Sequence, residues 1–211
     1  MRVLVIGASR GIGREVVKAA LAAGHHVRAF ARSAGSLEVD DAGLEKRRGD
    51  ALRREDVASA LGGVDAVVQA LGVRGSELFR PVSLFSAATR ALVPEMERLG
   101  VRRLVAVTGF GAGDSGQAVS LVERVPFRLL LGRAYDDKGV QEQLIKDSTL
   151  DWTIVRPGVL VPGSATGRYK VLAEPRQWRN GFISRANVAH FIVGELVANQ
   201  FVRHAPVLVT L

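Results

Sequence analysis

The sequence predicts a single α/β domain in which a doubly wound, mostly parallel sheet carries helices on both faces. Short apolar runs alternate with segments of helical spacing along all 211 residues. The runs are continuous and rich in β-branched residues, which is typical of parallel strands buried on both faces. With 47% hydrophobic and 24% charged residues, the composition favours a folded chain, and the length fits one domain.

The chain opens with a strand, a tight turn, a helix and a second strand. The apolar run 3–6 predicts the first strand. Residues 14–23 place apolar side chains on one side of a helix, and Gly24 follows as the kind of residue that commonly ends one. The next apolar run predicts a strand over 26–31. This order is the repeating unit of a parallel sheet.

The same alternation continues through the middle of the chain. A short third strand is expected over 46–49, a helix over 53–61 and a fourth strand over 65–69. Residues 84–99 have the spacing of a long helix. Because proline lacks the backbone donor that a helix interior needs, Pro94 predicts a kink or a break into two pieces.

The second half of the chain adds further strands and helices. Strands are predicted over 103–108, 152–155 and 206–210, and helices over 138–147 and 184–198. Ser184 is a suitable N-cap for the last helix. The glycine-rich segment 109–116 and the mixed segment 159–179 are expected to be irregular. Both follow strands, so both should lie at the carboxyl edge of the sheet, where ligands bind in such folds.

The turn after the first strand has the features of a phosphate site. Gly7, Gly11 and Gly13 follow a buried strand and open a helix. Glycines allow a phosphate to approach the backbone closely, and the start of a helix offers unpaired N–H groups. The context predicts a Rossmann domain that binds a dinucleotide. The cofactor-binding residues expected in this turn are Gly7, Ser9, Arg10, Gly11, Ile12 and Gly13.

The end of the second strand indicates which dinucleotide is bound. NAD sites usually place an acidic residue there, whereas NADP sites place an arginine near the 2′-phosphate. This chain has Arg32 and Ser33 at that point, and Arg10 in the glycine turn is aimed at the same region. A guanidinium pairs well with phosphate and stacks on adenine. The sequence therefore predicts NADP (NADPH) in preference to NAD.

Two further strand ends supply candidate cofactor contacts. Asp50 and Ala51 follow the third strand, where a carboxylate can accept a hydrogen bond from the adenine amino group. An N-cap or turn role for Asp50 explains it equally well. The small-residue segment Ala70, Leu71 and Gly72 follows the fourth strand and would let a ribose lie against the backbone.

Composition excludes several other classes of function. There are no cysteines, which excludes disulfides, thiolate metal sites and thiol nucleophiles, and the four histidines have no metal-ligand spacing. The net charge is +8, but the basic residues are spread out and only 6% of residues are aromatic, so no nucleic-acid site is expected. No apolar run is long enough for a membrane helix, and the N-terminus does not read as a signal peptide. We expect a cytoplasmic protein whose partner is a small-molecule substrate.

Several motifs together resemble a known family. They are GASRGIG at 7–13, GD at 49–50, QALG at 69–72, VAVTG at 105–109, DWTIVRPG at 151–158 and ISRANVAHFIVGEL at 183–196. The chain resembles the atypical short-chain dehydrogenase/reductases, NmrA-like, close to the flavin reductase / biliverdin-IXβ reductase branch. The resemblance implies one NAD(P)-binding Rossmann domain over 1–211, with a small substrate-facing part within 157–185.

The same resemblance suggests catalytic candidates. The tyrosine-dependent branch of the superfamily uses a Ser or Thr after strand five, with Tyr and Lys four residues apart on a helix. Here Thr108 ends the strand, whereas Tyr135 and Lys138 are three apart, with Tyr135 at or just before the start of the helix. Lys138 could bind the ribose hydroxyls of the nicotinamide nucleoside and lower the pKa of a neighbouring tyrosine.

The end of the sixth strand departs from the biliverdin-reducing branch. A histidine typical of that branch is replaced by Gly158, so biliverdin reduction is not assigned and the substrate stays open. Pro157 and Gly158 are expected to border the nicotinamide. Arg156 is a candidate for binding a substrate anion or for a salt bridge beneath the loop.

Three functions are compatible with these residues. The first is an NADP(H)-dependent reductase that transfers hydride to a flavin, a quinone or a small carbonyl. The second is a non-catalytic NmrA-like protein that senses NADP(H). The third, ranked lowest, is a sugar-nucleotide epimerase or dehydratase, because the substrate domain of such enzymes is usually larger than this chain supplies.

Overall fold

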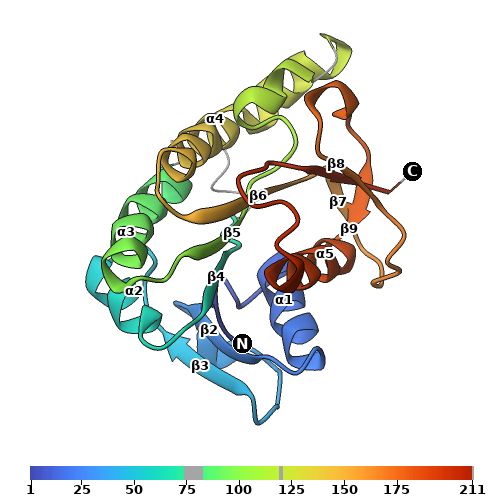
Figure 1. The fold of residues 1–211 in the computed structure, drawn as a ribbon. Coiled ribbons are helices and arrows are strands. Elements are labelled where there is room, and N and C mark those ends of the chain that lie inside the picture. The colour runs from blue at the N-terminus through green and yellow to red at the C-terminus, as the bar shows by residue number, and fades with distance from the viewer. Residues whose placement is uncertain (74–82, 119–120, 211) are drawn as a thin grey trace.

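A computed structural model describes residues 1–73, 83–118 and 121–210, with the side chains of 121–131 left out of the description. Within these residues, eight strands form one sheet in the order β3-β2-β1-β4-β5-β6-β10-β8 (Figure 1). Their bounds are β1 Arg2–Ile6, β2 His26–Ala31, β3 Leu44–Arg48, β4 Ala66–Gln69, β5 Arg103–Val107, β6 Asp151–Pro157, β8 Lys170–Leu172 and β10 Val207–Val209. Neighbouring strands run parallel except β8, which is antiparallel to β10. The predicted doubly wound, mostly parallel sheet is confirmed.

Helices cover both faces of this sheet. The helices are α1 Gly11–Ala22, α2 Arg54–Leu61, α3 Leu84–Leu99, α4 Leu121–Lys146 and α5 Arg185–Ala198. Helices α1 and α5 pack together on one face, while α3 contacts both α2 and α4 on the other (Figure 1). The described residues also form the short 3₁₀ helices η1 Ala34–Ser36, η3 Gly113–Ala118 and η4 Pro175–Gln177. A small separate sheet pairs β7 Val159–Val161 with β9 Phe182–Ser184.

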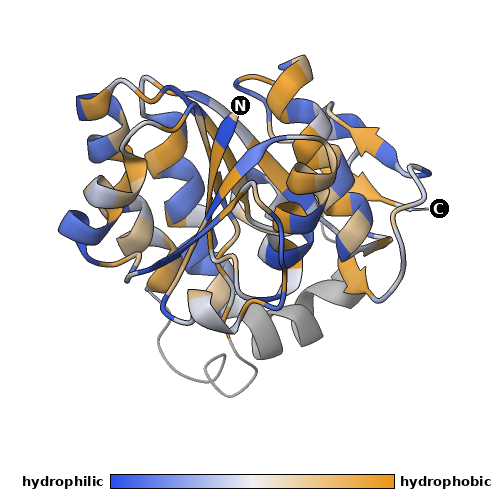
Figure 2. Cartoon of the chain, turned by 90° about the horizontal axis from the view of Figure 1, so that it is seen from below, coloured by the Kyte–Doolittle hydropathy of each residue, from blue (hydrophilic) through white to orange (hydrophobic). Residues whose placement is uncertain are grey.

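The core follows from strands that are apolar on both sides. Along β1, Val3 and Val5 join the hydrophobic cluster under α1 and α5, whereas Leu4 and Ile6 join the cluster under α2 and α3. Successive side chains of a strand point to opposite faces, so a continuously apolar strand needs cover on both. In Figure 2 hydrophobic colour runs through the central strands, and the flanking helices carry both colours.

One expectation about the helices was wrong, and of the two outcomes expected at Pro94 the break does not occur. Helix α4 begins at Leu121 rather than near residue 138. Gly132 and Gly139 lower the intrinsic helix propensity of this segment, but packing against α3 overrides that preference. Helix α3 is not broken at Pro94. Pro94 lies on the exposed side of α3, and Arg90, whose carbonyl loses its partner there, is also exposed, so water can replace the missing hydrogen bond.

The remaining predicted elements differ from the structure mainly at their ends. Ser184 caps α5 as expected, because its side chain accepts a hydrogen bond from the Asn187 N–H at 3.0 Å. The segment expected to be irregular, 159–179, contains the short strands β7 and β8 and the helix η4.

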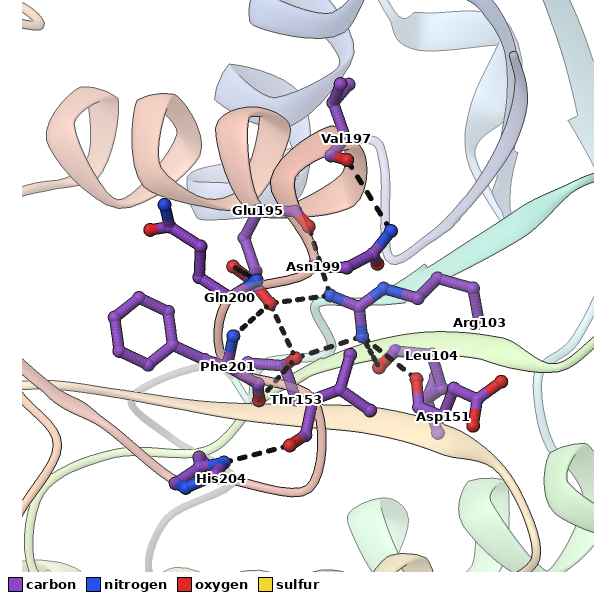
Figure 3. A network of polar contacts seen from close by, with 11 residues as sticks. Arg103, Leu104, Asp151, Thr153, Glu195, Val197, Asn199, Gln200, Phe201 and His204 are labelled. Carbon is purple, nitrogen blue, oxygen red and sulfur yellow. Dashed lines mark hydrogen bonds and ion pairs between the residues drawn. The ribbon is translucent and has the colours of Figure 1, made fainter.

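A buried ion pair ties together the amino-terminal edge of the sheet. Arg103, the first residue of β5, bonds the Glu195 carboxylate of α5 at 2.9 Å. Thr153 of β6 accepts from Arg103 at 2.9 Å, and the Phe201 N–H donates to Glu195 at 2.9 Å (Figure 3). This cluster therefore joins β5, β6, α5 and the chain after α5, at the edge where β5 and β6 begin.

Candidate functional site

A cavity of about 850 Å³ opens at the opposite edge of the sheet. Its wall includes residues at the carboxyl ends of β1, β2, β3, β4, β5 and β6. The chain order reverses between β1 and β4, which is the position where doubly wound sheets bind ligands. The volume lies within the roughly 300–1,000 Å³ typical of small-molecule and cofactor sites.

The turn between β1 and α1 is built closely around its glycines. Gly7 has a positive φ of 87°, and a Cβ atom there would lie 2.6 Å from the Ala70 carbonyl oxygen. A Cβ on Gly13 would lie 2.2 Å from the Gly7 oxygen. Both distances are too short for any side chain. The glycines therefore let α1 start directly against the ends of β1 and β4.

The start of α1 is available to an anion. Its N-cap residue is Arg10, whose side chain makes no capping hydrogen bond, and the first turn contains no acidic residue. Helix N-terminal N–H groups that no side chain caps attract phosphate through hydrogen bonds and the helix dipole. The Arg10 guanidinium donates to the Gly72 carbonyl at 3.2 Å and so spans the turn and the end of β4.

The ends of β2 and β3 form one end of the cavity. Arg32 and Ser33 line it and are exposed, and the Arg32 guanidinium has no polar partner among the described residues. Asp50 lies in the same wall, with its carboxylate accepting from the Leu52 N–H at 3.0 Å. That contact is the turn role that the sequence left open for Asp50, and the other carboxylate oxygen has no bond of its own among those described.

The other end of the cavity brings Thr108, Tyr135 and Lys138 together. The Tyr135 hydroxyl lies over the backbone after β5, since a Cβ on Gly109 would be 2.7 Å from it. Tyr135 lies well inside α4, so the expectation that it begins the helix was wrong. The spacing of three residues still places Tyr135 and Lys138 on neighbouring positions of one helix face.

Lys138 is held at a half-buried position beside two aromatic rings. Its ammonium donates to the Thr108 carbonyl and lies 5.0 Å from the Phe85 ring centroid and 5.2 Å from that of Tyr135. Burial lowers the pKa of Lys138 to about 8, and the charge of Glu142 opposes that shift. Burial raises the pKa of Tyr135. The expectation that Lys138 lowers the pKa of a neighbouring tyrosine therefore fails for Tyr135, because desolvation dominates.

Arg156 does not offer its charge to a substrate. Its side chain is completely buried and bonds Glu142 of α4 and Asp114 of η3. Burial acts to lower the pKa of Arg156, but the hydrogen bonds and charges of the two carboxylates outweigh it and raise that pKa. Of the two roles considered from the sequence, the salt bridge beneath the loop is the one observed. The bond between Arg156 and Asp114 fixes the segment 109–116 to β6.

The cavity wall contains nearly all of the predicted site residues. Those found there are Gly7, Ser9, Arg10, Gly11, Ile12, Arg32, Ser33, Asp50, Ala51, Ala70, Leu71, Gly72, Thr108, Tyr135, Lys138, Pro157 and Gly158. Gly13 is not in the wall, because it packs behind Gly7. The sequence reasoning missed Leu84, Phe110, Asn180 and Arg185, which also line it. Arg185 could have been found from its position directly after the Ser184 N-cap, at the start of a helix.

The comparison with protein families agrees with this geometry. The profile of the NAD(P)H-binding family matches residues 7–199. The chain belongs to this family. The match begins at Gly7, directly after β1, and ends just past α5, so it includes β2, β3, β4, β5 and β6, whose carboxyl ends line the cavity. The uncapped start of α1 and the glycine-built turn fit the pyrophosphate that members of the family bind.

The chain is also similar to individual proteins and solved structures. An uncharacterized chloroplastic protein of Arabidopsis thaliana is 31% identical over 206 residues, covering 94% of this chain and 73% of that protein. ChuY of Escherichia coli O157:H7, named an anaerobillin reductase, is 28% identical with a TM-score of 0.83, covering 99% of this chain and 97% of that one. A short-chain dehydrogenase/reductase of Veillonella parvula in complex with NADP is 19% identical with a TM-score of 0.81, covers 99% and 94% of the two chains, and shares the fold.

The described part of the chain lacks two other kinds of feature. No group of histidine and acidic side chains there could hold a metal ion. None of the helices described is both long and apolar enough to cross a membrane.

Proposed function

We propose that this protein is an NADP(H)-dependent reductase that transfers hydride to a small acceptor, either a flavin, a quinone or a carbonyl compound. The observation that carries the proposal is that one cavity joins the uncapped start of α1 to Thr108, Tyr135 and Lys138. A dinucleotide held at α1 by its phosphates would reach these side chains with its other end. The name of ChuY as a reductase supports the same type of reaction.

The preference for NADP rests on the end of β2. An acidic side chain at this point would repel a 2′-phosphate, and Arg32 and Ser33 stand there instead. Because the Arg32 guanidinium has no polar partner among the described residues, it is available for charge-assisted hydrogen bonds to phosphate. Arg10 adds a second guanidinium in the same cavity.

The reaction end supplies orientation and protons. A bound nicotinamide supplies the hydride. Lys138 keeps an ammonium group beside Thr108, where it can bind hydroxyl groups of a ribose. Tyr135 and Lys138 are titratable side chains in this part of the wall and can donate a proton. Leu84 and Phe110 provide apolar surface against which a planar acceptor can lie.

The second candidate function is a sensor that binds NADP(H) without turnover. The raised pKa of Tyr135 favours it, because a weaker acid transfers a proton less readily at neutral pH. Oxidation of NADPH in the presence of FMN, menadione or an aromatic aldehyde separates the two functions. We expect turnover with at least one acceptor and a loss of tenfold or more in Lys138→Met, while Lys170→Met on the exposed strand β8 serves as the matched control. Tight NADPH binding with no turnover would favour the sensor.

A further inference from the structure

Three hydrogen bonds fix Thr108 at the end of β5. Its backbone N–H donates to the Val155 carbonyl at 2.9 Å, and its carbonyl accepts from the Lys138 ammonium. Its side-chain hydroxyl donates to the Glu142 carboxylate at 2.7 Å. Lys138 and Glu142 are four residues apart on α4, so one face of this helix holds both the backbone and the side chain of Thr108.

The Glu142 carboxylate is itself held as an acceptor. Its side chain is only 1% exposed, and the Arg156 Nε donates to the same oxygen that Thr108 bonds, at 3.0 Å. Arg156 also bonds the second oxygen of Glu142. A guanidinium can only donate, so the carboxylate oxygens must accept. The hydrogen in the Thr108–Glu142 contact therefore comes from Thr108.

This contact decides what Thr108 can offer to a ligand. A hydroxyl has one hydrogen to donate and two lone pairs that accept. With the hydrogen given to Glu142, only acceptor capacity is left for the cavity. Two nearby backbone donors are already used, since the Phe110 N–H donates to the Pro157 carbonyl at 2.9 Å and the Gly158 N–H to the Leu208 carbonyl at 3.0 Å.

We propose that Glu142 is a positioning residue that makes Thr108 a hydrogen-bond acceptor toward the cavity, suited to the carboxamide N–H of a nicotinamide and unable to donate to the carbonyl oxygen of a substrate. The inference rests on the proposed function, because it needs a nicotinamide nucleotide in the cavity. It assigns Thr108 a role opposite to that of a hydroxyl that polarises a carbonyl. It also assigns a role to Glu142, which does not line the cavity.

The test compares the dissociation constants of NADP⁺ and its 3-acetylpyridine analogue. The analogue keeps the carbonyl but replaces the amide nitrogen by a methyl group, so it cannot donate to Thr108. We expect the wild-type protein to bind NADP⁺ about fivefold more tightly, as the loss of one neutral hydrogen bond implies. Thr108→Val should bind both nucleotides alike, and Thr108→Ser should keep the preference.

Variants of Glu142 separate positioning from a purely structural role. Glu142→Met frees the Thr108 hydroxyl to donate to the carbonyl that both nucleotides carry. The ratio of their two dissociation constants should therefore fall toward one. Because this variant leaves Arg156 buried with less compensation, the double variant Glu142→Met/Arg156→Met is measured beside it. If the role of Glu142 is purely structural, its loss should weaken the binding of both nucleotides equally and leave the ratio of their dissociation constants unchanged. Adding Glu142→Met to Thr108→Val should not change the ratio further.

The outcomes are distinct. Two results would overturn the role of Glu142 while leaving the proposed function intact. One is that the wild-type protein binds NADP⁺ and the analogue with equal dissociation constants. The other is that the folded Glu142 variants keep the preference of the wild-type protein for NADP⁺. Binding of neither nucleotide by the wild-type protein would overturn the proposed function, and this role with it.

Discussion

Two buried arginine–glutamate pairs lie at opposite edges of the same sheet and do different work. Arg103 and Glu195 join the beginnings of β5 and β6 to α5 and to the chain that follows it. Arg156 and Glu142 join the end of β6 to α4. The first pair bonds Thr153 and backbone groups that lie outside the cavity wall, whereas the second pair bonds Thr108 within it.

The surroundings of the two arginines differ in charge. Burial lowers the pKa of Arg103, and the bonded Glu195 carboxylate together with the charge of Asp151 offsets only part of that effect. Arg156 is bonded to two carboxylates, those of Glu142 and Asp114, and its pKa is raised. A buried ion pair therefore does not by itself reveal whether it serves the stability of the fold or the arrangement of the site. The third residue that it holds decides whether it stabilises the fold or also arranges the site.

The largest expected effect follows from breaking the pair far from the cavity. Glu195→Leu leaves Arg103 buried without its counter-charge, which typically costs about 3–5 kcal/mol of the free energy of unfolding. Urea denaturation measures this loss. The affinity of the folded protein for NADPH should stay within twofold of the wild-type value. A matched double variant, Glu195→Leu/Arg103→Met, should recover much of the stability, and a failure to recover it would show that the unpaired charge is not the cause.

The pair beside the cavity should respond in two measurements instead of one. Arg156→Met removes the charge that faces Glu142 and Asp114, and we expect a loss of about 3 kcal/mol, at the low end of the range for buried pairs because Lys146 lies 3.9 Å from Glu142 and compensates in part. The preference for NADP⁺ over its 3-acetylpyridine analogue should fall in the same variant. An Arg156→Met protein that is destabilised but keeps that preference would remove the difference between the two pairs.

The exposed Arg32 extends the comparison to a side chain that has no polar partner among the described residues. Arg32→Ala should change the free energy of unfolding by less than about 0.5 kcal/mol, as is usual for surface positions. It should lower the affinity for NADPH about tenfold and the affinity for NADH only slightly, because a charge-assisted hydrogen bond to the 2′-phosphate is lost. Arg102→Ala, at the opposite edge and paired with Asp151, is the control. Equal weakening of both nucleotides by Arg32→Ala would contradict the assigned contact.

A further expected effect is a pH dependence of stability that comes from Lys138 in the cavity wall. The pKa of Lys138, about 8 in the folded protein, lies below its ordinary value of 10.5. Between these two values the unfolded chain binds more protons at this side chain, so its contribution to the free energy of unfolding rises with pH. Denaturation at pH 7.5 and pH 10 should show a larger rise for the wild-type protein than for Lys138→Met. An identical rise in both proteins would rule out a lowered pKa of Lys138.

Much of the cofactor half of the site could be predicted because its signals are local. Gly7 and Gly11 adjoin a buried strand and a helix start, and Arg32 follows the second strand directly. The parallel pairing of the strands then brings their carboxyl ends to one edge of the sheet, where such folds bind ligands. The family resemblance identified Thr108, Tyr135 and Lys138 in the same way, from motifs that the chain carries in sequence order.

The buried network beneath the site could not be predicted. Glu142 is 34 residues from Thr108 and 14 from Arg156, and only the packing of α4 on β5 and β6 brings the three together. Arg156 in the sequence fits a substrate contact as well as a salt bridge. Helix α4 itself begins earlier than local propensity suggests. Tertiary contacts, which leave no short-range pattern, determine all three outcomes.

The most direct test of the account is a titration of the wild-type protein with NADPH and with NADH at the same ionic strength. The start of α1 has no side-chain cap, and the Arg32 guanidinium has no polar partner in the part of the chain that the structure describes. These features predict saturable binding of both nucleotides, with NADPH bound about tenfold or more tightly. Equal affinities, or tighter binding of NADH, would contradict the assignment of the 2′-phosphate site. No saturable binding of either nucleotide would contradict the proposed function as a whole.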